Sequence, residues 1–505
     1  MEQNNSPKNE KKQPDHPLIA ILKFLPLFLF AALVLFLKFD LLIAAPIASF
    51  VAIVVYMLTS KVKFGDAFEH GMEATKKIIL VFFILMFATT VGECFMKTGV
   101  GAAMINLALK LGVSARTIAP VCLLVCSLLS VATGSSWGTF AACAPIFLWL
   151  SHIVGGNAGL TVCAIAGGSC FGDNIGMISD VTVLSCGMQN IRIIDRVKHQ
   201  LFWSIGCLLL SGLVFYLVGL IGMKLPATTG DVTEAISKID IDVETMNALK
   251  KENESAWQML HQLQQSNIPY YMIIPVVVVI GLSFLNIHTL LCLGAGIFSS
   301  LILGTLAGTI GFSDWFSATG IIFKGFESAG SWVVIMMMWI SLFGGIMNAM
   351  DAFAPLKRLV VRMSKNVHHL MGWCSVLCLL GNAALADEAA QVSTMSPIVR
   401  DIVEQNTECD SEADAYALRV KLATFTSAMG IYGSELIPWH CFPVFFAGIA
   451  SMVYPLQEFR PVDIISKNYT SFIIIGSILI LTFTGLDRFI PKFGLPKSAR
   501  LKKQS

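Results

Sequence analysis

Apolar segments long enough to cross a lipid bilayer recur along this chain and limit its fold more than any other feature. A helix needs about 20 apolar residues to span the hydrocarbon core. Segments of this kind lie at residues 18–37, 41–59, 78–97, 199–222, 269–287, 288–310, 331–350 and 468–489. Because a helix satisfies its own backbone hydrogen bonds in lipid, these segments predict an all-α polytopic membrane protein whose main partner is the bilayer.

The composition argues against a soluble protein of this size. Hydrophobic residues make up 55% of the 505 residues and charged residues only 13%, whereas soluble domains carry about 25% charged residues. The net charge of +2 gives no basic surface of the kind that binds nucleic acid. The 13 cysteines form no CxxC pair and no Cys/His ligand spacing, so we expect buried apolar thiols rather than a metal site.

The order of features repeats along the chain. Each half contains two spans, an amphipathic connector, a third span, two interrupted apolar stretches and a final span. Ala-Pro-Ile at 144–146 corresponds to Ser-Pro-Ile at 396–398. His-Gly-Met-Glu at 70–73 corresponds to Lys-Gly-Phe-Glu at 324–327, at nearly the same offset. Internal repeats are typical of secondary transporters and place the substrate site where the halves meet. The amphipathic connectors are residues 64–77 and 313–330.

We expect the two repeats to be inverted. If the interrupted stretches 117–152 and 367–402 are re-entrant hairpins, each repeat has about five transmembrane helices plus a hairpin, and an odd number of crossings inverts the second repeat. With the N-terminus inside, basic residues concentrate in the inner loops, as the positive-inside rule requires; Arg192, Arg196 and Lys198 form one such group. Full crossings in place of the hairpins also put both termini inside and stay as an alternative.

These spans divide the chain into predicted segments. We expect a multi-pass membrane protein with both termini in the cytoplasm. No motif sets the oligomeric state, and a homodimer is one arrangement compatible with the sequence. The segments are a cytoplasmic N-terminal tail at 1–16, a first transmembrane repeat at 17–222, a polar extramembrane loop at 223–268, a second transmembrane repeat at 269–490 and a basic cytoplasmic tail at 491–505.

A first polar break interrupts the apolar stretch 117–152. Residues 132–139 read Ala-Thr-Gly-Ser-Ser-Trp-Gly-Thr, which matches the G-x-S-x-G elbow of serine hydrolases. That motif requires a strand before it and a helix after it, whereas the flanks here are membrane-like. We therefore expect an unwound hairpin tip, because irregular backbone at membrane depth is tolerated where it lines a cavity.

A second break carries two carboxylates. Gly-Asp-Asn at 172–174 is followed by Ser-Asp-Val-Thr at 179–182. A charge inside a membrane segment is costly and usually marks an ion path or a proton relay. Asp173 and Asp180 share one face if this stretch is a continuous helix, and an interfacial loop is the alternative. The candidate ligands in the first half are Ser135, Ser136, Thr139, Asp173, Asn174, Ser179, Asp180 and Thr182.

The second half has corresponding breaks. The offset that aligns the two Pro-Ile segments places the Ser-Ser pair at 135–136 on Asp387 and Glu388, so one tip is rich in hydroxyls and the other is acidic. This asymmetry suits a cation bound between the halves, while a helix cap at the membrane rim is the alternative role for the acidic pair. Glu435 is a further acidic candidate, and His440 is either a titrating group or an interface anchor.

These motifs resemble the NhaC family of sodium/proton antiporters, within the wider ion-transporter superfamily. Thr-Gly-Ser-Ser-Trp-Gly-Thr at 133–139 and Phe-Gly-Asp-Asn-Ile-Gly-Met-Ile-Ser-Asp-Val-Thr at 171–182 carry the likeness. Leu-Ile-Pro-Trp-His at 436–440 and Ala-Asp-Glu at 386–388 resemble later motifs of that family. With the matching order of repeats, the likeness covers roughly residues 40–490.

The chain departs from the family pattern in places. The family usually shows F-G-D-H-x-S-P-I-S-D-T-T, where this chain has Asn174, Gly176, Met177 and Val181. Members of the same fold group exchange organic anions or amino acids with a coupling ion, including malate for lactate. Na⁺- or H⁺-coupled transport of a small organic anion or amino acid is therefore the alternative substrate prediction.

The resemblance implies a secondary active transporter of the inner (cytoplasmic) membrane that exchanges Na⁺ for H⁺ by alternating access and is not an enzyme. It implies no cofactor beyond the transported or coupling Na⁺ and H⁺. A carboxylate in a low-dielectric site can hold a proton or a cation, and hard cations prefer carboxylate, carbonyl and hydroxyl oxygens. We hypothesise that Asp173 and Asp180 bind Na⁺ and exchange it for a proton. The remaining ligands of this hypothetical site are Ser135, Ser136, Thr139 and Asn174.

Overall fold

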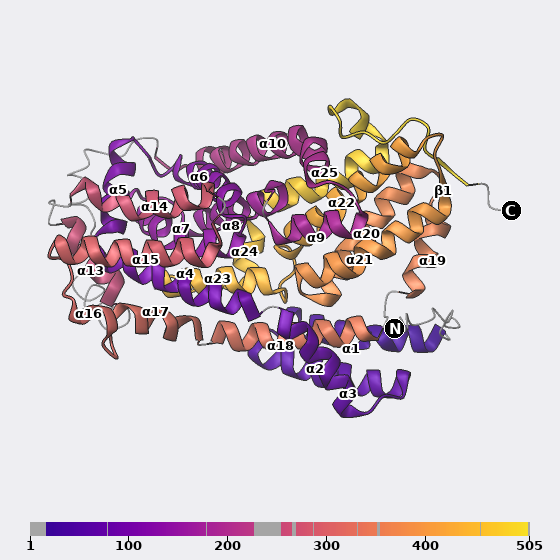
Figure 1. Ribbon diagram of the computed structural model, residues 1–505, viewed down its shortest axis with the longest axis horizontal. Coiled ribbons are helices and arrows are strands. Elements are labelled where there is room, and N and C mark those ends of the chain that lie inside the picture. Colours follow the sequence, from indigo (N-terminus) through magenta and orange to yellow (C-terminus); the bar gives the residue numbers. More distant parts are fainter. Residues whose placement is uncertain are drawn as a thin grey trace, which may run out of the picture.

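The computed structural model is a bundle of helices (Figure 1). Among the residues that it describes, the only strands are β1 (Thr407–Glu408) and β2 (Arg500–Leu501), which pair antiparallel. The predicted helical class is confirmed for these residues. The predicted tail at 1–16 lies outside them, as does most of the loop at 223–268. The described residues are 17–77, 79–177, 179–226, 254–264, 269–285, 287–330, 332–350, 354–454 and 456–502.

Helices make up most of the described chain in both halves of the sequence. Those of the first half are α1 (Pro17–Leu35), α2 (Leu41–Ser60), α3 (Phe64–Lys77), α4 (Ile79–Thr98), α5 (Val100–Lys110), α6 (Ile118–Thr133), α7 (Ser136–Ile153), α8 (Ala158–Ile175), α9 (Asp180–Gln189) and α10 (Ile193–Leu217). The later ones are α13 (Glu254–Gln264), α14 (Ile274–Phe284), α15 (Thr289–Leu306), α16 (Ser313–Phe316), α17 (Ile321–Gly330), α18 (Trp332–Ala349), α19 (Ala354–Met363), α20 (Val367–Leu385), α21 (Glu388–Asn406), α22 (Glu412–Ser434), α23 (Cys441–Val453), α24 (Pro461–Ser466) and α25 (Tyr469–Thr484).

Several helices have the length and composition to cross a membrane. Within the described residues, 3 helices qualify in full: Leu41–Ser60, Ile193–Gly222 and Val367–Leu385. The shorter apolar helices of 10–17 residues include Ile118–Val131 and Cys441–Val453, which adjoin polar breaks. The apolar face of α10 is exposed at Phe202 and Leu209, as expected for a helix that faces lipid. The first predicted connector is the amphipathic α3, and the second consists of α16 and α17.

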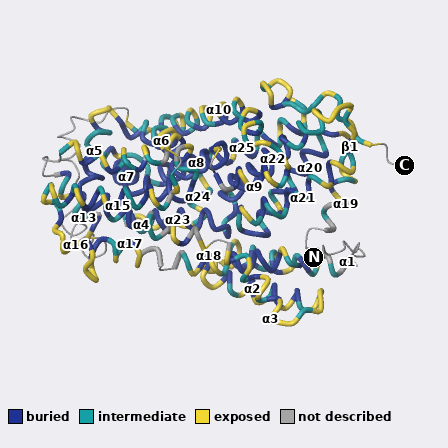
Figure 2. Tube along the Cα trace, viewed as in Figure 1, coloured by how far each residue is buried: buried dark blue, intermediate teal, exposed yellow. Residues whose placement is uncertain are grey.

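The helices around the polar breaks form the interior of the bundle. Nearly every described residue of α7 and α8 is buried, as is most of α22 and α23 (Figure 2). Around this interior, α5, α13 and α16 lie at one end of the long axis, while α19 and β1 lie at the other (Figure 1). A helix that is apolar on all sides needs a protein environment or lipid around it, and here other helices supply it.

The first pair of breaks has the same local structure in both halves. Gly134 ends α6 with a φ of 66°, and Ala386 ends α20 with a φ of 53°, both in the left-handed region. The next residue caps the following helix. Ser135 Oγ accepts a hydrogen bond from the N–H of Gly138 at 3.2 Å, and Asp387 Oδ1 accepts one from Ala390 at 2.7 Å. The predicted alignment of 135–136 with 387–388 therefore joins residues in equivalent positions.

The second pair of breaks separates α8 from α9 and α22 from α23. Because α8 ends at Ile175 and α9 begins at Asp180, Asp173 and Asp180 belong to different helices. The expectation that they share one face of a continuous helix is therefore wrong. Gly176 ends α8 in an extended conformation, which turns the chain away from the helical path.

Close contact between two helix backbones holds the first interrupted stretch in place. A Cβ atom added to Gly172 of α8 would lie 2.0 Å from the carbonyl carbon of Ser130 in α6. No side chain can shift to relieve that contact, because the opposing atoms are backbone. Glycine at this position therefore allows α6 and α8 to touch directly beside the break.

Gly172→Ala is expected to destabilise the fold by about 3 kcal/mol or more, as overpacking of a rigid contact does. The measurement is thermal unfolding in detergent with a thiol-reactive dye, which suits a chain in which 12 of 13 cysteines are buried. Gly187→Ala in α9 is the control, because nothing lies within 4 Å of the added Cβ. Equal unfolding temperatures for the two variants would contradict the close contact.

Candidate functional site

The carboxylate of Asp173 lies at the N-terminus of α7. Its Oδ2 accepts a hydrogen bond from the backbone N–H of Ser136 at 2.7 Å. Asp173 comes from the last turn of α8 and is only 4% exposed. The free N–H groups and the dipole at a helix N-terminus stabilise a negative charge. This contact joins the break between α6 and α7 to the break between α8 and α9.

Arg196 of α10 holds the α8–α9 break from the other side. The side chain is fully buried, and its Nη1 donates to Thr182 Oγ1 at 2.8 Å while Nη2 donates to the carbonyl of Asn174 at 2.9 Å. Gln200 donates to the same carbonyl at 2.6 Å. Thr182 Oγ1 donates to the carbonyl of Asp173 at 3.0 Å. These bonds satisfy carbonyls that the end of α8 leaves free.

The prediction that Arg196 lies in an inner loop is wrong. Within the described residues it forms no ion pair with a carboxylate, and its role is to hold backbone and hydroxyl oxygens. Arg196 and Gln200 lie four residues apart and so share one face of α10, but the sequence does not show which oxygens that face contacts.

Asp387 and Glu388 begin α21 beside the second tip. Asp387 caps α21, which agrees with the alternative interpretation of this residue as a helix cap. Glu388 is the first residue of the helix and is 7% exposed. Both residues lie near Cys441 at the start of α23. Glu388 is therefore buried and Asp387 half-buried where α21 approaches α23.

Glu435 ends α22 and is fully buried. Its Oε2 accepts a hydrogen bond from Ser471 Oγ at the start of α25. Glu435 therefore connects the end of α22 with the N-terminus of α25. Its partner Ser471 was not identified from the sequence, because its role depends on helices that meet only in the fold.

Carboxylates from both halves lie near α8. Asp173, Glu388 and Glu435 are all close enough to Cys170 to influence its thiol. The hydroxyl of Tyr432, one turn before Glu435, lies near Glu435 and Asp173. We call Asp173, Glu388 and Glu435 the carboxylate cluster.

Several buried oxygens at this cluster lack hydrogen-bond partners among the described residues. They are Ser136 Oγ, Tyr432 OH and Glu435 Oε1. An unsatisfied buried polar group costs about 1–3 kcal/mol. Oxygens of this kind, next to carboxylates, form a donor set that suits a hard cation or water.

The α22–α23 break is tied to the α20–α21 break by a buried polar network. Asn382 Nδ2 donates to the carbonyl of Gly430 at 2.8 Å, and Asn382 Oδ1 lies 3.1 Å from His440 Nε2. His440 Nδ1 accepts from the N–H of Phe442 at 3.2 Å. Because Nδ1 is the acceptor, Nε2 carries the proton and donates to Asn382 and to Ser434. His440 is thus a helix cap and network member in the neutral form.

The remaining predicted site residues have mainly local roles. Thr139 is buried and its hydroxyl lies 2.9 Å from that of Thr133. Ser179 caps α9 and accepts from the N–H of Thr182 at 3.4 Å. Asp180 is the first residue of α9, and its side chain lies outside the described part of the structure. The Ser-Ser pair matches the hydrolase elbow in sequence but not in structure, because helices α6 and α7 flank it on both sides.

Comparison with known proteins gives the chain a family. The profile of the Na⁺/H⁺ antiporter family matches residues 11–175 and 168–486. A malate-2H⁺/Na⁺-lactate antiporter of Bacillus subtilis is 26% identical over 208 residues, which cover 41% of this chain and 36% of that protein. The Na⁺/H⁺ antiporter NhaC of Alkalihalophilus pseudofirmus is 20% identical over 402 residues, covering 77% of this chain and 79% of that protein.

Two further proteins are similar to parts of the chain. The arginine/ornithine antiporter ArcD of Halobacterium salinarum is 23% identical over 392 residues, covering 74% of this chain and 72% of that protein. The crystal structure of the Alcanivorax borkumensis YdaH transporter is 13% identical, covers 84% of this chain and 90% of that chain, and has a TM-score of 0.39. A score this low does not establish a shared fold. Since the family profile spans most of the sequence, the predicted family is confirmed, and this chain belongs to the Na⁺/H⁺ antiporter family of secondary transporters.

Proposed function

We propose that this chain exchanges Na⁺ for H⁺ at the carboxylate cluster. Family membership supports the ion class. The observation that carries the proposal is that three buried carboxylates, Asp173 of the first half and Glu388 and Glu435 of the second, all lie near Cys170 of α8. A carboxylate in such a site binds a proton or a cation. The two compete because either one already neutralises the charge of the carboxylate. Na⁺ arriving from one side displaces a proton, and a proton from the other side displaces Na⁺.

Each contact of the cluster has a part in this exchange. The N–H of Ser136 favours the ionised form of Asp173 and so favours cation binding over protonation. The unpartnered oxygens of Ser136 and Tyr432 are neutral ligands for the cation. Asp180, next to Ser179 and Thr182, stays a predicted partner of Asp173. Glu388 and Glu435 extend the predicted site to the second half.

We also propose the finer topology. The α6–α7 pair joins α5 at one end of the molecule, and the α20–α21 pair joins α19 and β1 at the opposite end (Figure 1). Two helix pairs that point inward from opposite ends and break at equivalent residues support inverted repeats with re-entrant hairpins. The proposed location is the inner membrane, with both termini in the cytoplasm.

Asp173→Asn removes the charge of the cluster residue and keeps its size. We expect Na⁺-driven proton flux in everted vesicles to fall about tenfold or more, since losing one charged ligand costs at least about 1.4 kcal/mol. Asp401→Asn, an exposed position on α21, is the matched control and should keep full flux. Wild-type flux in Asp173→Asn would overturn the assignment.

The same vesicles separate cation exchange from the organic-anion alternative. A panel of Na⁺, Li⁺, K⁺, malate, lactate and arginine is supplied in turn, and proton movement is followed with a pH-sensitive dye. We expect Na⁺ to drive proton flux without any organic substrate. Flux that appears only with a carboxylate or amino acid would favour the alternative instead.

Arg196→Gln tests whether Arg196 positions the cluster. The shorter amide cannot reach both Thr182 and Asn174, so the α8–α9 break should loosen and Asp173 should shift from the α7 N-terminus. We expect a fall of about tenfold in flux, corresponding to about 1.4 kcal/mol, with normal expression. Arg192→Gln is the control, because that side chain is 77% exposed and pairs with Asp195 near the start of the same helix. Equal flux in both variants would show that Arg196 has no such role.

A further inference from the structure

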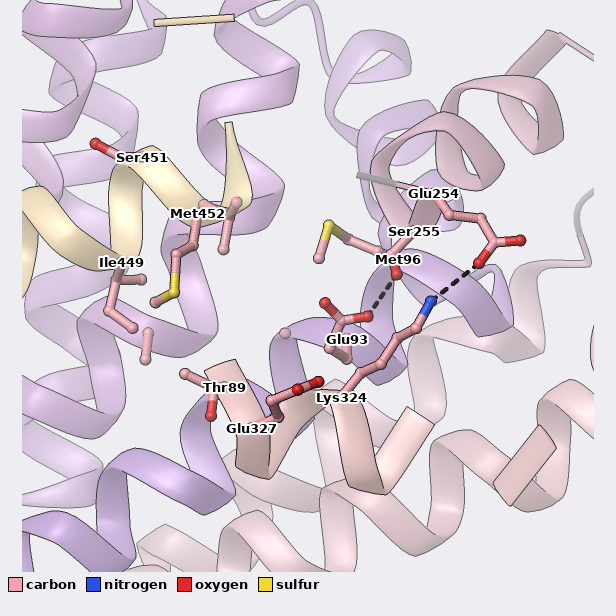
Figure 3. A pocket seen from close by; sticks show the side chains of 13 residues that line it. Thr89, Glu93, Met96, Glu254, Ser255, Lys324, Glu327, Ile449, Ser451 and Met452 are labelled. Carbon is pink, nitrogen blue, oxygen red and sulfur yellow. Dashed lines mark hydrogen bonds and ion pairs between the residues drawn. The ribbon is translucent and has the colours of Figure 1, made fainter. Parts of the chain in front are cut away.

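A polar cavity lies apart from the carboxylate cluster. It has a volume of about 390 Å³ and lies between α4, α7, α13, α17 and α23 (Figure 3). Helix α13 is the described part of the polar loop for which the sequence indicated no role. On the other side, Ile449 and Met452 of α23 form an apolar wall.

Charged side chains from three helices face this cavity. Glu93 of α4 accepts a hydrogen bond from Ser255 Oγ of α13. Lys324 of α17 donates to Glu254 of α13 at 3.0 Å, and Glu327 lies on the same side as Glu93 (Figure 3). Carboxylates therefore outnumber ammonium groups in the lining, and they still do when the neighbouring Lys97, 3.7 Å from Glu254, is counted.

The negative charge of Glu254 at the rim is maintained by its contacts. The hydrogen bond from Lys324 and the charge of Lys97 lower the pKa of Glu254, so this carboxylate stays ionised at neutral pH. A carboxylate with a lowered pKa stabilises the α13 contact above its unfolded pKa and loses that contribution as the pH falls through the folded value. The ion pair with Glu254 also engages the Lys324 ammonium group, which an anion would need for binding.

The cavity reaches from the surface to the buried helix α7. At the rim the side chain of Glu254 is 53% exposed, whereas Ala141 of α7 in the lining is 2% exposed. Ala141 lies five residues after Ser136 on the same helix, which at 1.5 Å per residue is about 7.5 Å along its axis. The buried side of the cavity therefore adjoins the helix whose N-terminus holds Asp173.

We propose that this cavity is a cation vestibule that takes up a hydrated monovalent cation before it reaches the carboxylate cluster, with α13 as its outer wall. Carboxylates between low-dielectric walls focus the field and raise the local cation concentration. At about 30 Å³ for each water, the volume accommodates an ion with a full hydration shell. The onward step rests on the proposed function, whereas cation accumulation in the vestibule does not.

Thiol labelling tests the vestibule without measuring transport. Met452→Cys is placed in a Cys409→Ser background, because Cys409 is the one native cysteine that is not buried. Two methanethiosulfonates of similar size are compared, one with a trimethylammonium group and one with a sulfonate. Leu111→Cys, 75% exposed outside the cavity, gives the intrinsic ratio of the two rates. Ser255→Cys on α13 is a second reporter in case Met452→Cys folds poorly.

We expect the cationic reagent to be favoured at Met452→Cys by about tenfold over the Leu111→Cys ratio. Adding Glu93→Gln should reduce that preference. Adding Asp173→Asn should leave it unchanged, so loss of transport and loss of the vestibule give separate results. No labelling at either reporter, or a ratio equal to that of Leu111→Cys with no effect of Glu93→Gln, would overturn the proposal.

Discussion

The hydrogen bond from the backbone N–H of Ser136 to the Asp173 carboxylate is the contact on which the site depends. It requires a helix that starts in the middle of an apolar stretch, and Gly134 permits that start by taking a left-handed conformation. It also requires α8 to approach α6 closely, which Gly172 allows. Arg196 then holds the other side of the break. The free N–H and carbonyl groups at helix ends would be costly in lipid. Here they form hydrogen bonds with protein groups instead.

The two halves use one backbone design with different side chains. In the first half the cap is Ser135, and the carboxylate at the helix start comes from Asp173 of a neighbouring helix. In the second half the cap is Asp387, and Glu388 of the helix itself is the buried carboxylate. Both halves therefore contribute carboxylates, whereas the hydroxyl groups at the start of α7 come from the first half. A relative movement of the halves would change how many carboxylates a cation contacts, which is what alternating access needs.

The sequence predicted the features that depend on short-range order. The apolar segments, the connector at 64–77 and the tips at 134–135 and 386–387 follow from local residues, and the structure has helices and breaks there. Features that depend on packing between distant segments were missed. Arg196 resembles any basic residue at a membrane edge until α9 and α10 fold over Asn174, and Glu435 meets Ser471 only where α22 and α25 come together. The helix-face argument for Asp180 failed because Gly176 ends α8 first.

Proton release on Na⁺ binding measures the competition between the two ions at the carboxylate cluster. Purified protein in weakly buffered detergent is mixed with NaCl, and the pH is followed with an indicator against choline chloride as the ionic-strength control. We expect proton release with NaCl in the native chain and little or none in Asp173→Asn. Equal release in Asp173→Asn, or Na⁺ binding without any proton release, would contradict competition at this cluster.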